Sequence, residues 1–209
     1  MVKLRQEDIK TKEVLSWKGL HLFHFQFSAC SMKTRIFLAL KEIAYESHHI
    51  DLQKKENFSP YFQGITPRSL VPVLIDDGDV HIESNDILEY LDEKYPSKSL
   101  IPPEKKDEIK KMMAEENDLH IDIRNITFKF LVPKFLNKVK IEEKAAAKAT
   151  LNGAEDSADD KNRAFWESYK KIGISDEVAT KSLLNIKNHL NEIDENLNHH
   201  TYIFFHHQT

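Results

Sequence analysis

The amino-acid sequence predicts an α/β domain followed by an all-helical domain. The first hundred residues alternate short aromatic and β-branched segments with segments of helical spacing, in the order strand, helix, strand, strand, strand, helix. The second half is rich in Lys, Glu and Ala and spaces its apolar residues three and four apart, which is typical of amphipathic helices. A proline-punctuated linker at 97–103 separates the two. We therefore expect an N-terminal extension over 1–18, an α/β domain over 19–96 and a helical domain over 104–209.

Composition narrows the class of protein. The 209 residues carry a net charge of −4, which argues against binding nucleic acid through bulk charge. The longest apolar run, 36–40, is far shorter than the ~20 residues of a membrane-spanning helix. Residues 1–18 mix charges of both signs and do not resemble a secretory signal. We expect a soluble, cytoplasmic protein that binds neither nucleic acid nor membrane. The single cysteine, Cys30, excludes an internal disulfide and a Cys-rich zinc site.

The first predicted elements form a βαβ unit. Residues 21–25 alternate and carry aromatic side chains, which indicates a strand. Residues 31–43 have helical spacing, and the extended stretch 44–52 follows at once. Strands joined in this way pair in parallel.

The next elements are a hairpin and a helix. Residues 71–75 and 80–82 predict two strands joined by the turn 77–79, and Ser84 is placed to cap a helix that ends before Pro96. An order of β-α-β and then β-β-α is the thioredoxin-like arrangement.

The second half predicts a helical bundle. A long helix is expected from 104 to about 131, where Pro133 kinks or ends it. Residues 144–161 contain few large apolar side chains and are expected to be exposed and mobile. The stripe of apolar residues over 175–198 predicts a final amphipathic helix.

The turn between the first strand and the first helix could carry chemistry. Backbone N–H groups and the positive end of a helix dipole meet at the start of a helix, and they stabilise anions there. Ser28 and Ser31 can donate hydroxyl hydrogen bonds, and a thiol at Cys30 would have a depressed pKa and be reactive. The alternative is that Ser28 merely caps the helix and Cys30 is a small buried apolar residue.

Two further features favour a binding site. Val71-Pro72 stands at the start of an extended segment, where its peptide bond could be cis, although most X-Pro bonds are trans, and its backbone could pair with an extended peptide. Glu83-Ser84 precedes a helix and could bind a carboxylate. Together with the turn, these features predict a pocket for a small peptide with its thiol near Cys30 and a carboxylate near Ser84.

These motifs resemble the glutathione S-transferase superfamily over residues 21 to about 203. The string over 28–35 is similar to the zeta-class motif Ser-Ser-Cys-Ser-x-Arg-Val-Arg, and it shares Cys-Ser-Met-Lys-Thr-Arg with the tetrachlorohydroquinone dehalogenases. The runs 57–74 and 83–91 resemble the region of the superfamily's cis-proline and its Glu/Gln-Ser-x-x-Ile-x-x-Tyr-Leu segment.

The resemblance implies a role for individual residues. Ser28 would stabilise the glutathione thiolate, and Cys30 would assist it or form a mixed disulfide with glutathione. The backbone of Val71 would hold the cysteinyl moiety, and Glu83 and Ser84 the γ-glutamyl moiety. Lys33 replaces the arginine of the zeta motif, which keeps the charge but loses the bidentate fork and weakens an isomerase assignment. The glutathione-binding positions implied are Ser28, Cys30, Ser31, Lys33, Asn57, Val71, Pro72, Glu83 and Ser84.

The resemblance also implies a second substrate, a small hydrophobic electrophile, and a homodimer. The candidates for contacting this substrate lie near the first strand and on the helix that begins at 104, and each could instead be core or interface packing. They are Phe25, Phe27, Met113, Asn117, His120 and Arg124.

A metal site is not expected. Adjacent histidines on a strand point to opposite faces, and no cysteine or acidic partner lies at ligand spacing from them. The pairs considered are 48–49, 199–200 and 206–207.

The sequence departs from the family after residue 203. Family members continue there with a capping box and further helices, whereas this chain ends at Thr209. We expect the helical domain to be incomplete.

Three functions remain in view. The leading one is a glutathione-dependent transferase acting by conjugation or reductive dehalogenation. Glutathione-dependent cis–trans isomerisation of a maleylacetoacetate-type substrate is the alternative within enzymes. The early end and the charge-rich segment 142–161 leave a non-catalytic binding or interaction module as the third.

Overall fold

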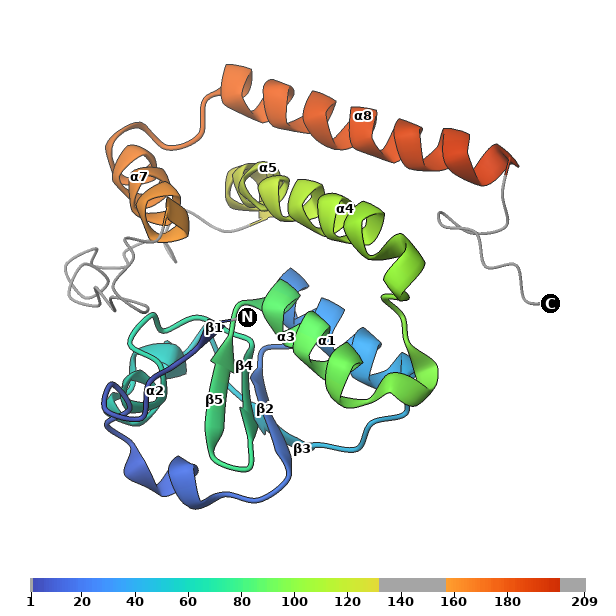
Figure 1. The fold of residues 1–209 in the computed structure, drawn as a ribbon. Coiled ribbons are helices and arrows are strands. Elements are labelled where there is room, and N and C mark those ends of the chain that lie inside the picture. The colour runs from blue at the N-terminus through green and yellow to red at the C-terminus, as the bar shows by residue number, and fades with distance from the viewer. Residues whose placement is uncertain (1, 132–156, 200–209) are drawn as a thin grey trace. The chain divides into compact units, whose positions relative to one another are not determined.

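The computed structural model describes residues 2–131 and 157–199 (Figure 1). The chain divides into two compact units near Ile101. The described part of the first unit is 2–101, with Ser157, and that of the second is 102–131 and 158–199. Each unit is described by itself.

The first unit is built on one five-stranded sheet with the order β1-β5-β4-β2-β3. The β2 and β3 strands pair in parallel, and the other neighbours pair antiparallel. The parallel pair is the one joined through a helix, as the βαβ prediction requires. The strands are β1 Val2–Lys3, β2 Leu20–His24, β3 Glu46–His49, β4 Val73–Asp76 and β5 Asp79–Ile82.

Helices cover both faces of this sheet. The α1 and α3 helices lie side by side on one face, and α2 lies on the other (Figure 1). The thioredoxin-like prediction is confirmed. The helices are α1 Ala29–Leu40, α2 Pro60–Ile65 and α3 Ser84–Lys94, with short 3-10 turns at Lys12–Ser16, Glu56–Phe58 and Pro96–Lys98.

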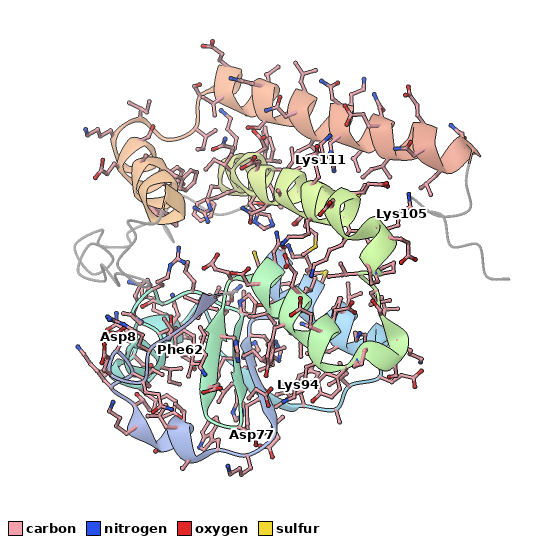
Figure 2. All side chains as sticks on the ribbon, in the orientation of Figure 1. Asp8, Phe62, Asp77, Lys94, Lys105 and Lys111 are labelled. Atoms are coloured by element: carbon pink, nitrogen blue, oxygen red, sulfur yellow. The ribbon has the colours of Figure 1, made fainter. Side chains whose placement is uncertain are left out.

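The core follows from the alternation of side chains along β4. Val73 and Ile75 join the cluster that contains Phe62 of α2 (labelled in Figure 2). Leu74 points the other way, is fully buried, and pairs across the sheet with Leu22 of β2. Both faces of the strand are therefore apolar, which is why it reads as a continuous hydrophobic run.

The first sixteen residues belong to the structure of this unit. Their backbone pairs Val2 with Ile82 of β5, and Leu4, Ile9 and Val14 are buried in the core. The chain passes so close to α2 that a Cβ atom on Gly64 would lie 2.1 Å from Thr11 Oγ1. The segment set apart as an extension in the sequence analysis thus supplies an edge strand and part of the core.

The start of α3 differs by one residue from the prediction. Glu83 is the N-cap, with φ +68°, and Ser84 is the first helical residue. The assignment of the cap to Ser84 is wrong because the positive φ of Glu83 turns the chain one position earlier.

The described part of the second unit is helical. The single helix expected over 104–131 is interrupted at Leu119, whose N–H is shared between the carbonyls of Glu115 (3.2 Å) and Glu116 (3.1 Å). In the described residues no helix is both long and apolar enough to cross a membrane. The elements are α4 Lys106–Asp118, α5 His120–Ile126, a π turn Thr127–Leu131, α7 Ser157–Ile172 and α8 Asp176–His199.

The segment expected to be exposed and mobile ends inside a helix. Its residues 157–161 open α7, which the sequence analysis missed, while Pro133 and 144–156 lie outside the described residues. Phe128 packs edge-to-face on Phe165 and Trp166, with ring centroids 5.8 and 5.1 Å away. Phe165 and Trp166 follow the segment 144–161 in the chain, so a prediction based on the composition of that segment alone could not include their contacts.

Candidate functional site

The N-terminus of α1 is fixed by its two serines. Ser28 Oγ accepts a hydrogen bond from Ser31 N at 3.3 Å, so the predicted cap is present. Ser31 is fully buried, and its Oγ accepts from Phe25 N at 3.3 Å. Ser31 therefore stabilises the turn between β2 and α1 through a buried hydrogen bond. Ser28 is half-buried, and because its oxygen accepts, its hydroxyl hydrogen can be donated outward.

Cys30 is the second residue of α1 and is half-buried. Thr34 donates its hydroxyl hydrogen to the Cys30 carbonyl at 3.1 Å. The first turn of a helix carries N–H groups without intrahelical acceptors and the positive end of the dipole. A sulfur anion near Ser28 and Cys30 would be stabilised by both.

The first turns of α1 and α3 are joined directly. Lys33 Nζ donates to Asn85 Oδ1 at 2.6 Å across the two helices. This contact brings the predicted thiol end of the pocket next to the predicted carboxylate end at Ser84. Asn85 has no role in the sequence analysis, because nothing in a single sequence shows which side chain a lysine 52 positions away will meet.

A second cation lies at the start of α3. Arg68 Nη1 pairs with Glu83 Oε1 at 2.5 Å, and the Arg68 side chain is only 3% exposed whereas that of Glu83 is 38% exposed. A charge-assisted hydrogen bond of this kind fixes the carboxylate in place. Arg68 belongs to the run 57–74 that carries the family resemblance, but the sequence analysis gave it no role.

The loop before β4 is held by Asn57. This residue is buried and donates from Nδ2 to the carbonyl of Ser69 at 2.9 Å. Ser69 itself has φ +54°, and the following Val71–Pro72 peptide is cis. Within the described residues Asn57 Oδ1 has no hydrogen-bond partner. Asn57 thus supports the backbone that leads into Val71 and Pro72.

The residues suggested for a second substrate are divided between the two units. In the first unit Phe27 is 70% exposed and packs edge-to-face on buried Phe25. In the second unit His120 Nε2 lies 2.8 Å from Glu116 Oε1, and the Arg124 guanidinium lies over the ring of Phe165 at 5.0 Å. The other two candidates, Met113 and Asn117, lie on α4, where Met113 is half-buried and Asn117 exposed.

The reason for discounting a metal site is wrong at one place. The parallel register pairs His21 with Glu46 across β2 and β3, and His48 lies two residues after Glu46 on the same face. Their ligand atoms all lie within 4.8 Å of one another. The search for adjacent histidines does not find Glu46, because the register of two strands brings it to His21. Of the C-terminal pairs, His199 ends α8 and the others lie outside the described residues.

Comparison with known proteins finds a family match within the first unit. Residues 22–99 match the family model described as glutathione S-transferase, N-terminal domain. This part of the chain is similar to glutathione S-transferase N-terminal domains. The resemblance drawn from the turn at 28–35 and from the segment 83–91 is confirmed.

Relatives in sequence include zeta-class and isomerase proteins. A glutathione S-transferase zeta class protein of Euphorbia esula is 43% identical over 83 residues, which are 40% of this chain and 37% of the relative. A probable maleylacetoacetate isomerase of Caenorhabditis elegans is 41% identical over 93 residues, 44% of this chain and 42% of the relative. The chain thus matches well under half of the length of these relatives.

A likeness to solved structures extends further along the chain. The crystal structure of a beta-etherase from Sphingobium sp. strain SYK-6 superposes with a TM-score of 0.65 at 25% identity, covering 86% of this chain and 73% of that one. The helical region that follows the thioredoxin-like domain therefore has a counterpart in a solved structure, and the prediction of a helical second half is confirmed.

Proposed function

We propose that this protein binds glutathione and presents its thiolate to a small hydrophobic electrophile. The observation that carries the proposal is the 2.6 Å contact between Lys33 and Asn85, which joins the first turns of α1 and α3. A peptide lying there has one helix N-terminus for its sulfur and another for its carboxylate, and helix N-termini favour anions.

Each part of glutathione has a matching group. The thiolate would accept the hydroxyl hydrogen of Ser28 beside Cys30, and the backbone of Val71 would pair with the cysteinyl moiety. The γ-glutamyl carboxylate would lie at Ser84, and Glu83 would accept from the γ-glutamyl amino group. Ser31 and Asn57 are buried, so in this proposal they position the turn and the loop, and Lys33 and Pro72 shape the groove between them.

Catalysis would come from ionising the thiol and positioning it. The thiolate is the nucleophilic form, so a site that lowers the thiol pKa raises the reactive fraction at neutral pH. In conjugation the sulfur forms a bond to an electrophilic carbon and a leaving group such as halide departs with its electron pair. Phe27, Met113, Asn117, His120 and Arg124 remain the candidates for contacting the electrophile.

Cys30 permits a reductive outcome. After the first glutathione displaces halide, the Cys30 thiolate could attack the sulfur of the conjugate, so that the carbon keeps the electron pair and takes up a proton. The mixed disulfide between Cys30 and glutathione is then resolved by a second glutathione. The net change is one halide replaced by hydrogen and two glutathione thiols oxidised to one disulfide.

A second candidate is reversible addition of glutathione to a maleylacetoacetate-type double bond, followed by rotation and elimination. The similarity to a probable maleylacetoacetate isomerase favours it, since 41% identity covers the domain that holds the thiol. Lys33 in place of the arginine in the zeta motif counts against it.

The proposal is tested by calorimetry with glutathione on the full chain. We expect saturable binding by the wild type and at least tenfold weaker binding by Ser28→Ala. If the protein binds glutathione but turns over no electrophile in a panel, the result would support the third function considered above, a non-catalytic interaction module. A folded protein that does not bind glutathione at all would overturn the proposal.

Cys30→Ser separates the two reactions. Loss of dehalogenation, with a mixed disulfide detected by mass spectrometry in the wild type, supports the reductive route. Full activity of Cys30→Ser in conjugation or isomerisation would remove Cys30 from the mechanism.

We also propose that the glutathione-binding elements lie within 19–96, in a domain whose sheet residues 2–16 complete, that 104–209 form the helical domain, and that a homodimer is the working form. Sedimentation of the full chain at micromolar concentration tests the last point, and a monomer there would contradict it.

A further inference from the structure

We propose that His21, Glu46 and His48 form a binding site for a divalent transition-metal ion such as Zn²⁺. The site joins β2 to the edge strand β3 on the face of the sheet that also carries Phe23, whose ring stacks on His48 at 4.6 Å. It is independent of the proposed glutathione site, because His21 lies at the opposite end of β2 from the turn to α1.

The distances between the ligand atoms suit such an ion. His21 Nδ1 lies 3.1 Å from His48 Nε2 and 3.3 Å from Glu46 Oε2. In a tetrahedral zinc site, with metal–ligand bonds of about 2.0–2.1 Å, two ligand atoms are about 3.3–3.4 Å apart. An ion bound by all three side chains would therefore need little rearrangement of the two contacts that involve His21.

The tautomer of His21 is set by a neighbouring carbonyl. His21 Nε2 lies 2.9 Å from the carbonyl oxygen of Lys18, which can only accept, so Nε2 carries the hydrogen. In the neutral ring Nδ1 then offers its lone pair toward His48 and Glu46. A backbone carbonyl on the second nitrogen is the usual partner of a metal-binding histidine, because it fixes both the tautomer and the ring orientation.

The neighbours of the cluster hold its two rings. Trp17 packs against both histidines, with ring centroids 4.6 Å from His21 and 5.0 Å from His48.

The chemistry of the set indicates which ion to test. Two imidazole nitrogens and one carboxylate oxygen suit Zn²⁺ and its first-row neighbours rather than Ca²⁺ or Mg²⁺, which prefer oxygen ligands alone. Three protein ligands leave a fourth position for water. Three lone-pair atoms that face one another would repel. Without a metal, His48 Nε2 therefore carries a hydrogen and donates it to His21 Nδ1.

The experiment is calorimetric titration of the chelator-treated full chain with ZnCl₂, using Glu46→Gln and His48→Gln. We expect each variant to lose one equivalent of zinc or to bind it at least tenfold more weakly than the wild type. The matched control is His49→Gln, which removes the adjacent histidine on the other face of β3 and is expected to bind as the wild type does. Glu46 is 74% exposed, so its variant should fold even where a histidine variant does not.

The thermal unfolding midpoint tests whether zinc binds at the cluster of His21, Glu46 and His48. Zinc should raise the thermal midpoint of the wild type and of His49→Gln but leave that of Glu46→Gln unchanged, because a ligand that binds only the folded state stabilises it. Wild-type stoichiometry and affinity in Glu46→Gln would overturn the proposal and point to zinc bound elsewhere, such as the C-terminal histidines. No binding to the wild type at micromolar zinc would also overturn the proposal, and the cluster would then be a hydrogen-bonded histidine pair.

Discussion

The described residues of the two units bury their apolar side chains to very different degrees. The first unit encloses a cluster in which Phe62, Ile65 and Val73 are completely buried. In the described part of the second unit the buried apolar side chains are Pro102, Phe165 and Ala179, while Leu183, Leu190 and others on α8 are exposed. The first unit has a core of its own around its sheet. The described helices of the second unit bury few apolar side chains, so equivalent substitutions should have unequal effects in the two units.

The largest effect is expected from removing a core aromatic ring. Phe62→Ala should lower the free energy of unfolding by about 3–5 kcal/mol, because it leaves a cavity in a fully enclosed core. Phe165→Ala in the second unit should cost less than half as much. Urea unfolding followed by fluorescence tests this, since Trp17 reports on the first unit and Trp166 on the second. Equal losses of unfolding free energy in Phe62→Ala and Phe165→Ala would contradict the difference between the two units.

Buried and exposed ion pairs provide the next contrast. Asp92 accepts from Lys41 Nζ at 2.5 Å and from the backbone N–H of Leu100 at 2.8 Å, and the Lys41 side chain is only 1% exposed. Asp92→Ala should cost about 3 kcal/mol, because it leaves a buried ammonium without its charge partner. Asp176→Ala removes an exposed partner of Lys129 and should leave the urea midpoint of the second unit unchanged. A shift as large as that of Asp92→Ala would contradict this account.

Lowering the pH should reduce the stability of the first unit, in part because His81 is buried. Burial lowers the pKa of this histidine, and within the described residues neither ring nitrogen has a hydrogen-bond partner. The unfolded state therefore takes up the proton first, so stability is lost as the pH falls below about 6.5, at ~1.4 kcal/mol for each unit by which the pKa is lowered. His81→Phe keeps an aromatic ring at the place that stacks on Tyr90 and should reduce this loss of stability between pH 7 and 5, as measured by urea unfolding at each pH. An unchanged pH dependence in His81→Phe would contradict the account.

A smaller loss of stability than at Phe62 or Asp92 is expected at the two helix caps, and glutathione binding distinguishes one cap from the other. Ser28 Oγ accepts from Ser31 N, and Ser175 Oγ accepts from Val178 N at 3.2 Å. Either serine replaced by alanine should lose about 1 kcal/mol of stability. Only Ser28→Ala should also weaken glutathione binding, which calorimetry on both variants measures. Equal weakening would show that the effect arises from stability alone.

Much of the first unit could be predicted because its patterns are local. The alternation over 21–25, the Asp77-Gly78 turn and the helical spacing after Ser84 each depend on neighbours in the chain. Asp77 lies at the turn of the β4–β5 hairpin, as expected (Figure 2). The break of the long helix at Leu119 and the start of α7 could not be predicted, because shared hydrogen bonds and distant aromatic contacts decide them.

The candidate site was predictable only in part. Ser28 as the N-cap of α1 and the cis peptide at Val71–Pro72 are present as expected. The contact of Lys33 with Asn85 and the pairing of Arg68 with Glu83 join residues 52 and 15 positions apart, and no periodicity encodes them.

The sequence by itself determined the β-α-β order over 20–49, the β-β-α order over 73–94, the family that the first domain resembles and the turn that could ionise a thiol. These features follow from local propensity and from short motifs. Only the tertiary structure decided that residues 2–16 complete the sheet, that Ser31 and Asn57 are buried, and that Glu46 meets His21 and His48. Such placements depend on strand register and on packing between distant segments, and these are set by the burial of the whole core.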